Sequence, residues 1–319
     1  MNEVLISICI PVYNDITNIG QALRSCISQL QSDVEIVVLD NCSTDGTFQH
    51  AKAYEAEKIK VFKNNVNLGA YGNHNQLLNI SHGRYIKFLH SDDILEDGAV
   101  VLLKQKIMSE PQIDLFAFNS NYISNKNNKI QRKEFTKSIT LRNLPANKFV
   151  KFGSFIGTPS MTMFKRSIIE TIGNFDSSME PSSDTEFWDR VLENCTVRLC
   201  TEFLVSVRDD PISKLQSYKL NKRFYNALLL RLNKLESRNG DNETLREITK
   251  FKFRMLIIHL FLATKLSILN IKFYYFFLVF FEIMRTVYNY KFIFKGKIRD
   301  LSPRLSKLWY QELIRYDQS

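Results

Sequence analysis

Short apolar runs alternate with amphipathic stretches through the first 120 residues, and this alternation restricts the possible folds more than any other feature. Five runs have the length and composition of strands: Leu5–Ile10, Val34–Leu39, Ile59–Phe62, Tyr85–Leu89 and Leu115–Asn119. Helical patterns lie between them, at Ile16–Leu30, Thr47–Glu57, Asn73–Ile80 and Gly98–Ser109. Strands separated by helices predict βαβ units and a mostly parallel α/β sheet, with ligands at the carboxyl ends of its strands.

The rest of the chain divides into three stretches. Residues 120–145 are polar and rich in Asn and Lys, which predicts a loop or an edge hairpin, and residues 146–210 resume mixed structure. From about Ser213 the pattern is helical. We therefore expect a domain over residues 1–212, divided into halves 1–120 and 121–212, and an all-helical extension over 213–319.

The net charge of +10 lies mainly in the expected extension. Residues 211–319 carry 21 basic and eight acidic side chains, so this part is suited to an anionic surface such as a membrane or a nucleic acid. Its aromatic residues form long apolar runs instead of alternating with the basic ones, and no nucleic-acid-binding signature is present. We therefore expect no nucleic-acid partner.

Residues 251–294 hold 14 aromatic side chains. Their most apolar piece, Phe273–Phe281, has nine residues, whereas a membrane-spanning helix needs about 20. A helix lying in the membrane surface fits this pattern, and so does a helical hairpin packed on the domain or on a second copy of the chain. The five cysteines lack zinc-site and CxxC spacing, and no secretory signal is visible, so we expect a cytoplasmic protein without disulfides.

Acidic residues follow three of the expected strands. Asp15 comes after the first strand, Asp40 after the second, and the pair Asp92–Asp93 after the strand Tyr85–Leu89. Adjacent carboxylates repel each other unless a cation lies near them, and Mg²⁺ or Mn²⁺ binds such groups together with phosphate oxygens. A helix N-cap explains the same residues. Neither GxGxxG nor a P-loop is present, which argues against a dehydrogenase or a P-loop kinase.

Several blocks resemble, in the same order, the motifs of the family 2 glycosyltransferases. These blocks are Ser7–Asn14, Glu35–Thr47, Asn67–Gly69 with Asn75, Gly83–Asp93, Gly157–Ser160, Ile172–Asp176 and Ser183–Trp188. The resemblance covers roughly residues 4–213. It implies a GT-A fold, which is a Rossmann-like, mostly parallel mixed sheet flanked by helices. It also implies inverting transfer of a sugar from a nucleotide-diphosphate sugar.

The resemblance also implies roles for individual residues. Asp184 would be the general base that deprotonates the acceptor hydroxyl, and Asp92 would hold Mn²⁺ or Mg²⁺. The other donor-side residues would be Pro11, Tyr13, Asp15, Asp40, Asn67, Gly69, His74, His90, Ser91 and Arg208. The acceptor-side residues would be Asp93, Pro159, Ser160 and Trp188.

The chain departs from the family pattern at three positions. His90 replaces a common Asp, His74 lies near a usual Arg, and Ser183 stands where a Glu is common. His90 would contact the ribose or the metal, or it would have a structural role only. These departures leave open a non-catalytic relative that binds a nucleotide sugar or a partner transferase.

Two charged positions also have alternative explanations. Asp184 and Glu186 are two residues apart, so they do not share a helix face and only one should reach the substrate. We expect Asp184 to be that residue and Glu186 to serve a salt bridge or a cap. Arg208 follows an apolar strand expected over Phe203–Val207, and it would clamp a phosphate or form a surface ion pair.

The expected function is sugar transfer to a lipid-linked glycan acceptor in surface polysaccharide biosynthesis. The donor would be a nucleotide-diphosphate sugar, and residues 251–294 would contact the inner face of the plasma membrane peripherally or form a homo-oligomer.

Overall fold

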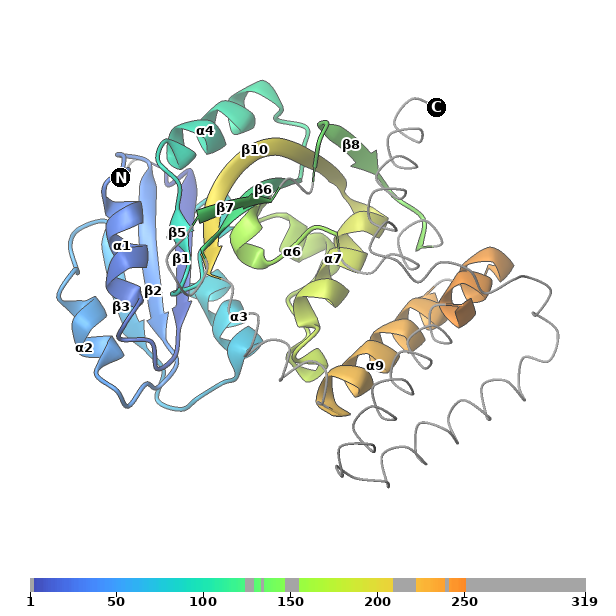
Figure 1. The fold of residues 1–319 in the computed structure, drawn as a ribbon, viewed down its shortest axis with the longest axis horizontal. Coiled ribbons are helices and arrows are strands. Elements are labelled where there is room, and N and C mark those ends of the chain that lie inside the picture. The colour runs from blue at the N-terminus through green and yellow to red at the C-terminus, as the bar shows by residue number, and fades with distance from the viewer. Residues whose placement is uncertain are drawn as a thin grey trace.

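A single mixed sheet with helices on both faces forms the main body of the molecule (Figure 1). The computed structural model describes residues 3–123, 129–132, 135–146, 155–208, 222–238 and 241–250. The strands of this part are β1 (Ile6–Val12), β2 (Val34–Asp40), β3 (Ile59–Lys63), β4 (Tyr85–Phe88), β5 (Ile94–Leu95), β6 (Leu115–Ile123), β7 (Lys129–Arg132), β8 (Ile139–Arg142), β9 (Thr162–Lys165) and β10 (Thr196–Arg208). Its helices are α1 (Ile19–Ile27), α2 (Thr47–Lys52), α3 (Ala70–Ile80), α4 (Ala99–Ser109), α6 (Ile168–Ile172), α7 (Ser183–Asn194) and α9 (Lys222–Arg238).

The strand order is β3-β2-β1-β4-β9-β6-β10-β5, with β7 beside β6 and β8 beside β10. Strands β3, β2, β1 and β4 run parallel, with Val12 opposite Asp40 and Cys9 opposite Phe88. The segments that follow β1, β2 and β4 therefore leave the sheet at the same edge. The predicted α/β fold with a mixed, mostly parallel sheet is confirmed.

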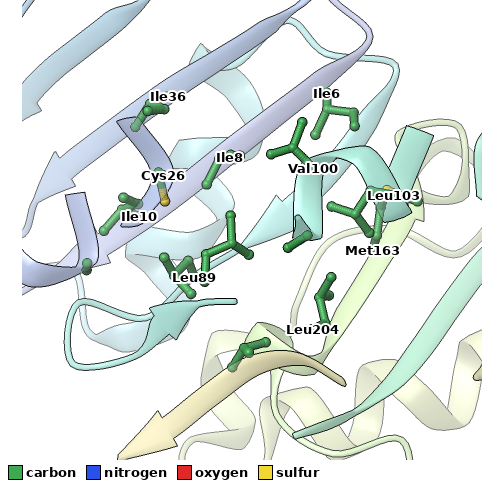
Figure 2. Close-up of a cluster of buried hydrophobic side chains, with 14 of the residues drawn as sticks. Ile6, Ile8, Ile10, Cys26, Ile36, Leu89, Val100, Leu103, Met163 and Leu204 are labelled. Atoms are coloured by element: carbon green, nitrogen blue, oxygen red, sulfur yellow. The ribbon is translucent and has the colours of Figure 1, made fainter. Parts of the chain in front are cut away.

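The alternation of side chains along β1 explains why both faces of the sheet are covered. Ile6, Ile8 and Ile10 pack in one cluster with residues of α1, α2 and α4 (Figure 2). Cys9 packs in the other cluster, with residues of α3, α6, α7 and α9. Successive side chains of a strand point to opposite faces, so a strand buried on both faces reads as the continuous apolar run that the sequence shows.

Several element boundaries differ from the expected ones. The helix expected over Ile16–Leu30 is α1, which begins at Ile19 because Asp15 and Asn18 form a side-chain hydrogen bond in the turn before it. The strand expected over Phe203–Val207 is the end of β10, which starts at Thr196. In the polar stretch, β7 pairs antiparallel with β6 as an edge hairpin, and β8 pairs with β10.

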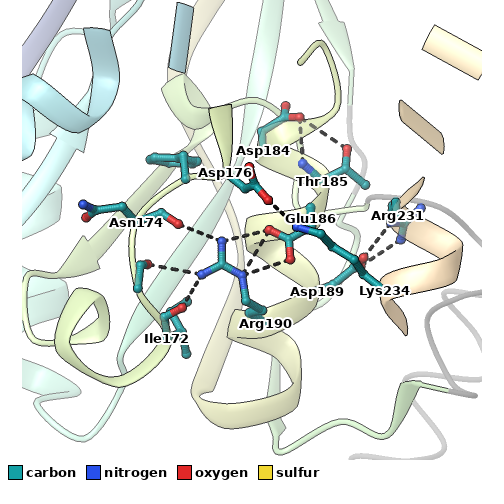
Figure 3. Close-up of polar contacts among 12 residues, drawn as sticks. Ile172, Asn174, Asp176, Asp184, Thr185, Glu186, Asp189, Arg190, Arg231 and Lys234 are labelled. Atoms are coloured by element: carbon teal, nitrogen blue, oxygen red, sulfur yellow. Dashed lines mark hydrogen bonds and ion pairs between the residues drawn. The ribbon is translucent and has the colours of Figure 1, made fainter. Parts of the chain in front are cut away.

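Helix α9, which belongs to the expected extension, contacts the domain. Its Arg231 is 1% exposed and forms a bidentate pair with Asp189 of α7, at 2.6 and 2.8 Å. Lys234 pairs with Asp176 (Figure 3), and Arg238 pairs with Glu186 at 2.9 Å. Residues 242–250 are also helical. The aromatic segment 251–294 lies outside the described residues, and within the described ranges no helix is long and apolar enough to cross a membrane.

The buried pair between α7 and α9 predicts a large stability effect. Removing one partner of a buried ion pair leaves an unpaired charge and costs about 3–5 kcal/mol. We expect Arg231→Ala to lower the free energy of unfolding in urea by that amount. Lys234→Ala, which breaks a half-exposed pair, should cost about 1 kcal/mol or less. The double variant Arg231→Met/Asp189→Leu should recover most of the loss because it removes both charges. Equal effects of the two single variants would contradict this account.

Candidate functional site

The polar segments after β1 and β4 meet at the common edge of the sheet. The Ser91 hydroxyl donates to Asp15 Oδ2 at 2.7 Å, which joins the two predicted donor-side segments. Asp15 also accepts from Asn18 at the start of α1. Tyr13, beside them, is 50% exposed, so its ring is available to a planar ligand. Pro11 is buried within β1.

The loop after β2 is held to the loop before α3. Asp40 is fully buried, and its Oδ2 accepts from the backbone of Ser43, while no hydrogen-bond partner for Oδ1 appears among the described residues. Asn41 donates to Asn67 Oδ1 at 2.9 Å and to the Gly69 carbonyl at 3.0 Å. Gly69 has a φ of 77°, in the region that favours glycine. The donor-side role that the family resemblance implies for Asp40 stays a prediction.

His90, Asp92 and Asp93 form a cluster. Each side chain offers one possible ligand atom, a ring nitrogen or a carboxylate oxygen, and these three atoms lie within 4.8 Å of one another. Asp93 is 2% exposed, and its Oδ2 has no hydrogen-bond partner within the described part of the chain. Burial, followed by the neighbouring Asp92 carboxylate, raises the pKa of Asp93 to about 7. A buried acceptor beside a second carboxylate is a suitable ligand for a divalent cation. The residues present therefore fit the predicted metal.

Arg208 and Ser160 hold this cluster from two neighbouring segments. The Arg208 backbone donates to Asp93 Oδ1 at 3.0 Å, and its guanidinium donates to the Asp92 carbonyl at 3.2 Å. Ser160 Oγ accepts from the His90 backbone at 2.9 Å. Ser160 is fully buried, so the structure shows it supporting His90, and its predicted acceptor contact is untested. Arg208 thus lies beside the cluster, which is the position that the predicted phosphate clamp requires.

A buried lysine lies beneath the cluster. Lys87 of β4 is fully buried and donates to the carbonyls of Phe88 and Ser160. Burial lowers the pKa of Lys87 to about 7. Sequence reasoning did not include Lys87 in the site. A charged residue inside the apolar run Tyr85–Leu89 was nevertheless a visible signal, because buried lysines without an ion-pair partner are rare.

Helix α3 connects the cluster to the other half of the site. His74 Nε2 lies 3.3 Å from His90 Nε2, and the Tyr71 hydroxyl is near enough to the Asp184 carboxylate to lower its pKa. Burial, followed by the His90 ring, lowers the pKa of His74 to about 3. His74 is therefore a neutral imidazole near pH 7. Tyr71 and His74 are three residues apart, so they lie on the same side of α3.

Asp184 and Glu186, both in the first turn of α7, have different environments. Asp184 Oδ1 accepts from the Thr185 backbone at 2.7 Å, and burial raises the pKa of this half-buried carboxyl to about 6. Glu186 is 2% exposed and pairs with Arg190 and Arg238. Figure 3 shows Asp184 turned to Thr185 and Glu186 turned to Arg190. The expected salt-bridge role of Glu186 is thus observed, and Asp184 has the pKa expected of a general base near neutral pH.

Glu180 is a second residue that sequence reasoning missed. Its Oε1 accepts from the Ala70 backbone at 2.9 Å, at the first residue of α3. The contact joins residues 110 apart in the chain, and no local pattern predicts such a pairing. A carboxylate at a helix N-terminus is stabilised by the helix dipole, so Glu180 holds α3 against the segment that leads into α7.

The other two predicted acceptor-side residues, Trp188 and Pro159, are buried, as Asp93 and Ser160 are. Trp188 is 1% exposed and donates from Nε1 to the Gly157 carbonyl at 3.0 Å, and Pro159 belongs to the buried turn that follows. In this structure Trp188 of α7 holds the Gly157 loop through this hydrogen bond. Its predicted role in walling the acceptor site is not tested by the structure.

Comparison with known proteins identifies the family. The model of glycosyl transferase family 2 matches residues 7–173. The uncharacterised protein MT1568 of Mycobacterium tuberculosis is 30% identical over 199 residues, which are 59% of this chain and 62% of that protein. WfgD of Escherichia coli, a UDP-Glc:alpha-D-GlcNAc-diphosphoundecaprenol beta-1,3-glucosyltransferase, is 30% identical over 152 residues, 46% of this chain and 57% of WfgD. The matched part of this chain thus spans less than two thirds of these relatives.

A solved structure shows the same fold. TarS 1–349 of S. aureus in complex with UDP-GlcNAc has a TM-score of 0.68 and 16% identity, covering 98% of this chain and 89% of that one. At that identity the likeness concerns the fold alone. The family model, however, matches more than half of the residues, from β1 to the end of α6, and the chain therefore belongs to glycosyl transferase family 2.

Proposed function

We propose that this chain is an inverting glycosyltransferase that moves a sugar from a UDP-sugar to a hydroxyl group of a lipid-linked glycan. The observation that carries the proposal is the position of Asp184. Through Tyr71 and His74, one helix connects this carboxylate to the His90–Asp93 segment. One base and one diphosphate-binding edge are the components that a single displacement needs.

The reaction requires a base for the incoming hydroxyl and charge stabilisation for the leaving diphosphate. Asp184, with its raised pKa, would accept the hydroxyl proton as the oxygen attacks the anomeric carbon. Bound at His90, Asp92 and Asp93, a Mn²⁺ or Mg²⁺ ion would supply positive charge to the diphosphate. Arg208 would add a donor beside it. Tyr13 would stack on the base, while Asp15 and Ser91 would order the neighbouring loops.

The relatives support the choice of donor and acceptor. The name of WfgD gives UDP-glucose as the donor and a sugar on diphosphoundecaprenol as the acceptor. The TarS structure contains UDP-GlcNAc. We propose the same two classes of substrate for this chain, in surface polysaccharide biosynthesis.

We further propose that residues 1–212 form the transferase domain and that residues 213–319 bring it to the membrane. The basic charge of the extension and its aromatic segment 251–294 support peripheral contact with the inner face of the plasma membrane. A homo-oligomer formed through the same segment is the alternative.

The base assignment predicts the behaviour of Asp184→Asn. The amide cannot accept the hydroxyl proton, so the transfer rate should fall by about 10²–10⁴-fold. Thermal stabilisation by UDP with Mn²⁺ should remain, because Asp184 is not assigned to the donor edge. In the wild type, kcat should fall as the pH drops below about 6, since protonation removes the base. Glu186→Gln is the neighbouring control, with a normal pH profile. Donor binding without transfer by the wild type would favour the non-catalytic alternative.

The acceptor proposal predicts a preference for lipid-linked glycans. We expect kcat/KM for GlcNAc-diphosphoundecaprenol in detergent micelles to exceed that for a water-soluble GlcNAc glycoside by about tenfold or more, equivalent to 1.4 kcal/mol of additional binding. The measurement is transfer of radiolabelled glucose from UDP-glucose at matched acceptor concentrations. Equal values for the two acceptors would contradict the lipid-linked assignment.

A further inference from the structure

Helix α9 contacts the chain on both sides of the candidate base. Lys234 of α9 pairs with Asp176, whose carboxylate caps the short helical turn before α7. Within α7, Glu186 pairs with Arg238 of α9 at 2.9 Å. Asp184 lies in the sequence between these two anchored acids. The position of α9 therefore determines how the segment that carries Asp184 is held.

The most buried of these contacts is the pair between Arg231 and Asp189. The guanidinium donates from Nε and Nη2 to the two carboxylate oxygens, at 2.6 and 2.8 Å, and the two side chains are 1% and 3% exposed. Two parallel hydrogen bonds fix the orientation of the partners as well as their distance. The pair therefore sets the rotation of α7 about its own axis.

Apolar packing already attaches α9 to α7. Leu232 and Leu235 have no exposed surface and belong to the same buried cluster as Phe187 and Trp188 of α7. Taking two charges out of water is costly, and an apolar pair of similar volume often stabilises a fold as well or better. Apolar attraction, however, has no preferred direction. A buried ion pair at this interface therefore points to a role in orientation rather than in stability alone.

The charge of Arg231 also acts on the candidate base itself. Asp189 follows Asp184 by five residues, which is about 7.5 Å along the helix axis, and the Arg231 guanidinium interacts electrostatically with the Asp184 carboxylate. Tyr71 acts on Asp184 from α3, while Glu186 and Asp189 are the charged neighbours on α7. A nearby positive charge favours an ionised carboxyl, which is the form that a general base needs.

We propose that Arg231 is a positioning residue for the base: by holding Asp189, it fixes the direction in which α7 presents Asp184 to the acceptor hydroxyl. This inference rests on the proposed function, since it concerns the carboxylate to which the base role is assigned. It also makes α9 part of the catalytic unit, although α9 belongs by sequence to the expected extension.

The first test separates orientation from stability. In Arg231→Met/Asp189→Leu, apolar side chains replace both charges, and we expect unfolding in urea close to that of the wild type. The kcat for transfer from UDP-glucose should nevertheless fall by about 10–100-fold, because a small displacement of a catalytic group has such an effect. KM for UDP-glucose should not change, since the donor edge belongs to other elements. Arg231→Lys keeps the charge but loses the paired hydrogen bonds, and its kcat should be intermediate.

The second test is the pH profile of kcat in Asp189→Asn. The amide oxygen still accepts a hydrogen bond from Arg231 but no longer neutralises its charge, so the guanidinium favours the Asp184 carboxylate more strongly. We expect the acidic limb of the profile to move to lower pH by about 0.5–1 unit. A general loss of stability does not produce a shift in this direction.

Glu193→Gln is the matched control for this shift. It makes the same change from carboxylate to amide on α7, at a residue that pairs with Arg238 of α9 at 3.3 Å. Glu193 lies about 13 Å from Asp184 along the helix axis, which exceeds the screening length of about 8 Å at physiological salt. Its acidic limb should stay where it is in the wild type.

The outcomes separate this inference from the proposed function. Wild-type kcat in the folded double variant, or an acidic limb that does not move in Asp189→Asn, overturns the inference alone when transfer by the wild type depends on Asp184. If the double variant does not fold, the Asp189→Asn profile decides. Transfer at the wild-type rate by Asp184→Asn overturns the proposed base and this inference together.

Discussion

Helix α3 holds the two halves of the candidate site in one arrangement, and the rest of the site depends on it. Asn75 donates to the Phe175 carbonyl at 2.8 Å and accepts from the Phe175 backbone at 3.1 Å. Glu180 accepts from the first residue of the helix. These contacts hold α3 to the segment that leads into α7, and from this position its side chains reach the Asp184 carboxylate and the His90 ring. A shift of α3 would thus change the base and the cation site together.

Burial, as well as ion pairing, determines the pKa values of the charged groups in the site. The Lys87 ammonium interacts electrostatically with the Asp93 carboxylate, and Arg208 contacts both Asp92 and Asp93 from the end of β10. On the other side, Glu186 is held by Arg190 and Arg238, which leaves Asp184 as the acid of α7 with a half-buried carboxyl and a pKa near 6. The two acids of this turn therefore have different environments: Glu186 is fixed in ion pairs, whereas Asp184 is the residue to which we assign the chemical role.

The sequence predicted the first half of the fold well because its central strands, such as β1, are buried on both faces. Ile6, Ile8 and Cys9 have no exposed surface, so the run that contains them is apolar throughout. Asp15, Ser91 and Asp92 could be placed at one edge because parallel strands end at the same side of a sheet. The family resemblance, now confirmed, supplied Asp184.

Contacts between distant segments could not be predicted from the sequence. Glu180 and Tyr71 acquire their roles only when α3 packs against the chain that precedes α7. The start of β10 was missed because Thr201 and Glu202 interrupt its apolar pattern, and the strand is irregular there, with register shifts against β6 between Leu199 and Val205. No local pattern marks Arg231 as a buried residue, because its burial depends on the contact with Asp189 of α7.

The central claim is that a single carboxylate, Asp184, drives direct displacement at the anomeric carbon. The most direct measurement is the configuration of the new linkage, determined by proton nuclear magnetic resonance on the first product formed from UDP-α-glucose. A mechanism with one base and no covalent intermediate inverts the configuration of the anomeric carbon, so the account predicts a β-linked product. An α-linked product would require two displacements or a front-face path and would contradict the account.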